Sequence, residues 1–119
     1  MTTQELKQRT FQFGIRVITA VEALPKGETG RILGRQLLRA GTSVGANYRA
    51  AARARSQADF VAKLGVVEEE CDESAYWIEM VLARKLLKKP QLSNLLAEAN
   101  ELLAITVASI KTARRNRRG

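Results

Sequence analysis

Residues 56–82 read SQADFVAKLGVVEEECDESAYWIEMVL, and this stretch sets the class of fold. Its apolar residues recur every three or four positions, as they do on one face of a helix. They are Phe60, Leu64, Val67, Cys71, Ala75, Ile78 and Leu82. Ser56 and Asp59 form a capping box before the first of them, which predicts a helix start near Ala58. We expect the helix to run to about Lys88, where Lys88-Lys89-Pro90 would end it with cations at its C-terminal dipole.

The same helical spacing recurs in three other segments, and no segment alternates as a strand would. Residues 2–24 open with a second capping box, Thr2 and Glu5. They carry one apolar stripe (Leu6, Thr10, Phe13, Val17, Ala20, Leu24) and a flanking one (Phe11, Ile15, Ile18), which predicts cover by more than one neighbour. Residues 29–55 carry Leu33, Leu37, Ala40, Val44, Asn47, Tyr48 and Ala51 on one face. Residues 92–110 carry Leu92, Leu95, Leu96, Ala99, Leu102, Leu103, Thr106 and Ile110.

The breaks between these segments are short, and the first holds Pro25, Gly27 and Gly30. Short connections make sequential helices antiparallel. The sequence therefore predicts an all-α, up-down-up-down antiparallel four-helix bundle as one domain over residues 1–110. Residues 111–119 are predicted to be a basic, disordered tail.

Composition argues against catalysis and against a metal site. The 119 residues include one Cys and no His, so neither a zinc site nor a His-activated nucleophile is available. The acidic run Glu68, Glu69, Glu70, Asp72 and Glu73 scatters around its helix, which favours a solvated or salt-bridged surface over a cation site. We expect a protein that is not an enzyme and uses no cofactor. With no secretory signal and no long apolar run, a cytoplasmic location is expected.

The net charge of +8 is unevenly distributed along the chain. Residues 31–56 hold six Arg and no acid, whereas residues 57–75 hold six acids and one Lys. Five of the arginines lie within an arc of about 80° on one continuous helix, a stripe about 33 Å long. They are Arg31, Arg35, Arg39, Arg49 and Arg53. The stripe has two interpretations: it binds the phosphates of RNA or DNA, or it pairs with the acidic block, within or between subunits.

The last segment is a second candidate for binding nucleic acid. It carries Lys111, Arg114, Arg115, Arg117 and Arg118, with no acidic block beside it. A solubility tail is the alternative interpretation. Because no aromatic residue is interleaved, any binding would be to the backbone and poor in sequence preference.

Four residues are candidates for an oligomer interface. Gly41 and Gly45 stand four apart, a spacing that permits close helix approach, although a kink at 41–43 is the alternative. Tyr76 and Trp77 are adjacent, so they cannot share a face. Trp77 falls about 100° from the core stripe, which favours a contact between subunits over a place at the rim of the core.

Several stretches of this sequence resemble those of a known protein family. The stretch QLLRAGTSVGANYR at 36–49 resembles the hallmark of the bacterial four-helix-bundle proteins, also called intervening-sequence proteins of large-subunit ribosomal RNA genes. DFVAKL at 59–64, Glu69 to Glu73, Tyr76-Trp77 and Leu24-Pro25 fit the same family, whereas Ala50 departs from its frequent Glu. The resemblance implies a bacterial protein that forms a ring-shaped homopentamer, and it carries no established activity. A more distant similarity, to the accessory protein of diversity-generating retroelements, implies binding of reverse transcriptase and nucleic acid.

Two hypotheses follow for the function. In the first, a non-enzymatic oligomeric bundle binds RNA or DNA through its basic surfaces. In the second, a structural or adaptor homo-oligomer binds a partner protein, and its arginines are used in salt bridges.

Overall fold

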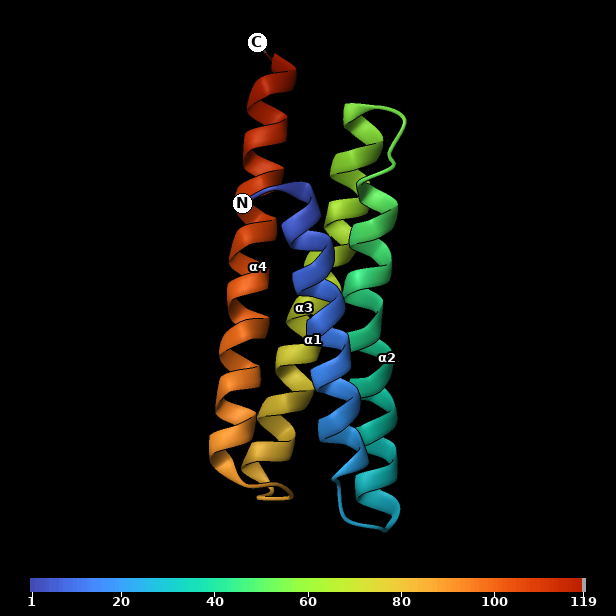
Figure 1. The fold of residues 1–119 in the computed structure, drawn as a ribbon, viewed down its shortest axis with the longest axis vertical. Helices are drawn as coiled ribbons and strands as arrows, with labels where there is room; N and C mark the ends of the chain where they lie inside the picture. Colours follow the sequence, from blue (N-terminus) through green and yellow to red (C-terminus); the bar gives the residue numbers. More distant parts are fainter. Residues whose placement is uncertain (119) are drawn as a thin grey trace.

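The computed structural model describes the backbone of residues 1–118 and the side chains of residues 1–116. This part of the chain forms four helices and no strand: α1 (Thr3–Glu22), α2 (Glu28–Ala51), α3 (Gln57–Ala83) and α4 (Lys89–Arg118). Successive helices run in opposite directions and pack side by side, and α4 closes against α1 with the smallest of the four interfaces (Figure 1). The bundle measures 52 × 21 × 20 Å. The predicted all-α four-helix bundle is confirmed.

Both predicted capping boxes mark true helix starts. Thr2 Oγ1 accepts a hydrogen bond from the backbone N–H of Glu5 at 3.1 Å, at the start of α1. Ser56 Oγ accepts one from the N–H of Asp59 at 3.0 Å, at the start of α3. Each bond satisfies an N–H group that has no partner inside its helix.

The boundary between α3 and α4 differs from the prediction. α3 ends at Ala83, and Lys85 adopts a left-handed conformation with φ +55°. The N–H of Leu86 then bonds the carbonyl of Val81 at 3.2 Å, and that of Lys85 bonds Leu82 at 3.0 Å, the pattern of a Schellman cap. Pro90 lies in the first turn of α4, where its missing N–H costs nothing, so it begins α4 rather than ending α3.

The end of α4 also differs from the prediction, which had a disordered tail from residue 111. The helix continues to Arg118 because the buried stripe extends past Ile110 to Ala113. Gln57 Nε2, at the start of α3, donates to the carbonyl of Ala113 at 3.2 Å and joins the two helices there. The side chains of Arg117 and Arg118, and Gly119, lie outside the described residues.

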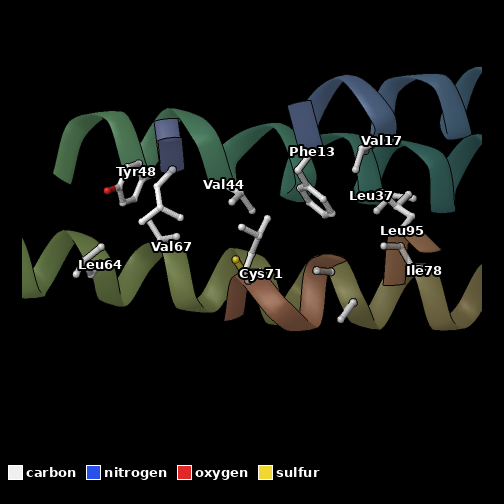
Figure 2. Packing of buried hydrophobic residues seen from close by; sticks show 14 of the residues in the cluster. Phe13, Val17, Leu37, Val44, Tyr48, Leu64, Val67, Cys71, Ile78 and Leu95 are labelled. Carbon is white, nitrogen blue, oxygen red and sulfur yellow. The ribbon is translucent and has the colours of Figure 1, made fainter. Parts of the chain in front are cut away.

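The core follows the predicted stripes. The largest fully buried side chains include Phe13, Leu37, Leu64, Ile78, Leu92 and Leu102. Figure 2 shows side chains of α1 and α2 pointing toward those of α3, with Cys71 among them, and Cys71 is the small buried residue that its position predicted. Three buried hydroxyls, those of Thr10, Ser74 and Thr106, each donate to the carbonyl four residues earlier at 2.7 Å. They therefore enter the core without an unmet hydrogen bond.

α2 runs without a break through residues 41–43. The hydroxyls of Thr42 and Ser43 donate back to the carbonyls of Leu38 and Arg39 at 2.7 and 2.6 Å. Gly41 and Gly45 face α1 of the same chain: a Cβ on Gly45 would lie 3.2 Å from the carbonyl oxygen of Thr10. The two glycines thus allow close packing of α1 on α2, while a role between subunits stays a prediction.

Candidate nucleic-acid interface

The predicted arginine stripe is divided by ion pairs. Arg39 forms a salt bridge with Glu73 of α3 and lies 3.5 Å from Glu70. Arg31 lies 3.5 Å from Glu28, one turn earlier on α2. Pairing with the acidic block thus holds for Arg39, whereas Arg31 pairs with an acid of its own helix. Arg35, Arg49 and Arg53 are exposed and form no ion pair with any other side chain that the structure describes.

The two basic segments of the sequence meet at one end of the bundle. The connection from α2 to α3 and the C-terminal turns of α4 both lie at this end (Figure 1). The bond from Gln57 to Ala113 fixes this proximity. We call the exposed cations here the basic end: Arg49, Arg53, Arg55, Lys111, Arg114 and Arg115.

Asp59 lies among these cations, and its charge is already matched. Lys63 Nζ contacts both carboxylate oxygens of Asp59 at 2.7 Å, and the N–H of Arg55 donates to one of them at 3.4 Å. The hydrogen bond from Lys63 holds the pKa of Asp59 below its usual value. Asp59 is therefore paired mainly with Lys63 of its own helix, and Arg55 is the one cation of the basic end whose charge also lowers the pKa of Asp59.

Sequence reasoning missed Arg55 as a site residue. Arg55 lies in the connection after α2 ends at Ala51, so it has no place on a helical face. The signal that could have found it was the run of six arginines without an acid in residues 31–56.

The middle of the bundle is acidic. The run from Glu68 to Glu73 lies halfway along α3, and Glu98 and Glu101 of α4 bind Arg9 of α1 at 2.7 and 2.8 Å. No group of three or more His, Cys, Asp or Glu among the described residues could hold a metal ion. None of the helices in the described range is long and apolar enough to span a membrane.

A groove between α1 and α2 leaves apolar side chains uncovered. Phe11 is 63% exposed and Ile15 42% exposed, so the flanking stripe of α1 lacks its second neighbour within this chain. The groove has a volume of about 900 Å³ and includes Thr42 and Gly45 of α2, with Lys7 and Arg49 at its edge.

A second uncovered apolar cluster lies on the face shared by α2 and α3. Tyr76 is 51% exposed and packs edge-to-face on Trp77, with ring centroids 4.9 Å apart. Trp77 is half-buried against the core, and its Nε1 donates to Glu73 at 3.3 Å. Ile32 and Met80 are 49% and 37% exposed. Ile32 precedes Arg39 by seven residues on α2, and Met80 follows Glu73 by seven residues on α3. Because the two helices are antiparallel and Arg39 contacts Glu73, Ile32 and Met80 lie on the same face of the bundle.

The fold and the distribution of charge define a basic, all-α bundle protein, and nothing in the described residues indicates catalysis. Residues 2–108 match the family model described as 23S rRNA-intervening sequence protein, and the chain belongs to that family. This confirms the predicted family, whereas the similarity to retroelement accessory proteins stays a prediction. A crystal structure of a protein of unknown function from the S23 ribosomal protein family of Bacteroides thetaiotaomicron VPI-5482 is similar, with TM-score 0.83 and 29% identity over 89% of this chain and 98% of that one. No curated protein matches.

Proposed function

We propose that this protein is a non-enzymatic binder of RNA or DNA, which it holds by the phosphate backbone at the basic end. One observation carries the proposal. Cations from two distant parts of the sequence, including Arg53 and Arg114, converge at one end of the bundle, exposed and without acidic partners among the described side chains.

The chemistry of the basic end suits phosphates rather than bases. Arginine presents forked donors that match phosphate oxygens. The exposed ring of Tyr76 lies in the half of α3 farther from the basic end, and that of Phe11 lies in the α1–α2 groove, which shares only Arg49 with the basic end. Binding should therefore tolerate any sequence and weaken steeply with salt, with a slope that grows by about 0.9 for each phosphate contacted on duplex DNA.

Fluorescence anisotropy with labelled RNA and duplex DNA, from about 50 to 300 mM salt, tests this function. The variant R53Q/R55Q/R114Q/R115Q should lose at least tenfold in affinity and have a smaller salt slope. The control, R16Q/R31Q/R35Q, removes three exposed charges of α1 and α2 that lie outside the basic end. The control should lose less than threefold, because the Debye length is about 8 Å at physiological salt.

Equal losses in the two variants would mean that only net charge matters and would overturn the basic end as the site. No binding by the wild type at about 50 mM salt would overturn the function. Substitution is preferable to deletion of residues 112–119, since deletion also removes the buried Ala113.

The two uncovered apolar clusters favour a second candidate, a structural or adaptor homo-oligomer that joins its subunits through these faces and binds a partner protein. Lys7 and Arg49 line the α1–α2 groove, whereas the exposed Glu69 and Asp72 lie seven and four residues before Tyr76 and therefore on the same face of α3. Opposite charges around two different apolar surfaces suit head-to-tail association, which closes into a ring when the rotation permits. This supports the homopentamer expected from the family resemblance.

Single substitutions can test a head-to-tail contact. F11D places an acid in the groove and Y76R places a cation on the α3 face, so each should reduce the assembly to monomers in sedimentation velocity. A mixture of the two variants retains one intact groove and one intact α3 face and should form dimers but no ring. A mixture that stays monomeric, or variants that assemble as the wild type does, would contradict this arrangement.

A further inference from the structure

The end of the bundle opposite the basic end is also rich in exposed cations. The α1–α2 connection and the α3–α4 connection both lie there (Figure 1). They carry Lys26, Arg84, Lys85, Lys88 and Lys89. None of these five forms an ion pair within the described part of the chain.

Helix stability does not account for all of these charges. Arg84 follows α3 and suits its negative C-terminal end, whereas Lys88 and Lys89 lie at the start of α4, where a cation is disfavoured. The first turn of α4 contains no acid to offset them. Lys85 occupies a left-handed position where glycine is the usual residue. An external anion would offset this concentration of like charge.

The surface at the α3–α4 connection is hollowed. Lys85, Leu86, Leu87, Lys88 and Gln91 line an open hollow of about 600 Å³. Two lysines and one glutamine therefore line a space that can admit phosphate oxygens.

The two basic regions are electrostatically separate. The bundle is 52 Å long, several Debye lengths at physiological salt. The acidic run from Glu68 to Glu73 lies between them on α3, and the pairing of Arg39 with this run interrupts the arginine stripe on α2. Along α2 and α3, a phosphate backbone held at one end thus has no continuous basic track to the other.

From these observations we propose that the α3–α4 connection, together with Lys26, is a second phosphate-backbone site, so that one chain holds two separate segments of nucleic acid. The proposal rests on the proposed function, because the first segment is the one held at the basic end.

The number of short duplexes bound per chain tests the proposal. A 10-base-pair DNA duplex is about 34 Å long, too short to reach both ends. Isothermal titration calorimetry at about 50 mM salt should give two duplexes per wild-type chain. K26Q/R84Q/K88Q/K89Q should bind one duplex with the affinity of the basic end, whereas R53Q/R55Q/R114Q/R115Q should bind one duplex at least tenfold more weakly.

The outcomes separate this inference from the function on which it rests. One duplex per wild-type chain, with no change in K26Q/R84Q/K88Q/K89Q, would overturn the second site and leave the basic end intact. No duplex bound by the wild type would overturn both. In a second assay, the protein is first bound to an immobilised duplex and then offered a free labelled duplex. The amount of labelled duplex captured should fall at least tenfold in K26Q/R84Q/K88Q/K89Q. Undiminished capture would overturn the second site, because two basic ends in one oligomer would then be what holds the two duplexes together.

Discussion

Gly41 of α2 lies directly against Val17 of α1: a Cβ at Gly41 would stand 2.6 Å from Val17 Cγ2. Both residues are buried in the contact between the two helices. Two non-bonded carbon atoms cannot approach to that distance, so the separation of α1 and α2 depends on the absence of a side chain at position 41.

Replacing Gly41 by alanine should destabilise the fold. Overpacking a core costs about 1–3 kcal/mol, and the gain in helix propensity returns about 1 kcal/mol. An overlap at 2.6 Å belongs in the upper half of that range, so we expect the free energy of unfolding to fall by about 1–2 kcal/mol in urea denaturation. G65A is the control, since nothing lies within 4 Å of a Cβ there, and it should stabilise by about 1 kcal/mol. A neutral G41A would show that the helices separate at no cost.

Glu70 should reduce stability at neutral pH. Its Oε2 is buried without a hydrogen-bond partner, and burial raises the pKa of Glu70 although the nearby Arg39 opposes this. Because the pKa of Glu70 is higher in the folded state than in the unfolded state, folding favours the protonated carboxyl. The free energy of unfolding therefore falls as the pH rises from the unfolded-state pKa through the folded-state pKa. E70Q should therefore raise the free energy of unfolding at pH 7 by about 1 kcal/mol.

The pH dependence of this effect is the decisive measurement. The advantage of E70Q should shrink as the pH falls below the usual value of 4.5 for a glutamate, where the wild-type carboxyl is protonated in both states. E73Q should instead destabilise at pH 7, because Glu73 accepts hydrogen bonds from Arg39 and Trp77. An advantage of E70Q that is constant with pH would rule out ionisation as its cause.

Lys85 holds the end of α3 in an unfavourable conformation. A left-handed residue other than glycine costs about 1–2 kcal/mol, and glycine costs part of that in unfolded-chain entropy. K85G should raise the free energy of unfolding by about 0.5–1 kcal/mol, measured by thermal denaturation. K85A removes the same charge and keeps the strain, so it should show no such gain. Equal gains in K85G and K85A would identify the charge as the cause.

Arg9 closes the smallest interface of the bundle, the one between α1 and α4. Its hydrogen bonds to Glu98 and Glu101 raise the pKa of its guanidinium above the usual value. R9Q should lower the free energy of unfolding by about 1–2 kcal/mol, because Glu98 is largely buried and would lose its charged donor. Hydrogen exchange in α1 should accelerate more than in α2. R16Q, at an exposed position of α1, should change neither quantity.

Helix boundaries were predictable where a side chain of the local sequence satisfies the backbone. The capping boxes at Thr2 and Ser56 each marked a start to within about one residue. The boundary near Pro90 was not predictable from the sequence, because proline is compatible both with the end of one helix and with the first turn of the next. Only the Schellman bonds of Lys85 and Leu86 show which of the two is formed.

The candidate site was predictable residue by residue and not as a surface. The charge of each cation is a property of the sequence, whereas its pairing depends on what folds against it. Arg39 and Arg35 lie on the same helix, yet only Arg39 is within reach of Glu70 and Glu73. The sequence could not distinguish them, since the ion pairs join residues more than 30 positions apart.

The sequence by itself determined that this chain forms four antiparallel helices with a continuous apolar core, because a helical period of apolar residues can be buried in few other ways. It also determined the excess of positive charge. The tertiary structure alone decided where that charge is exposed. It brings Arg53 and Arg114 to the same end of the bundle, pairs Arg39 with Glu73 in the middle and extends α4 past residue 111. These outcomes depend on distances between helices, which no local pattern specifies.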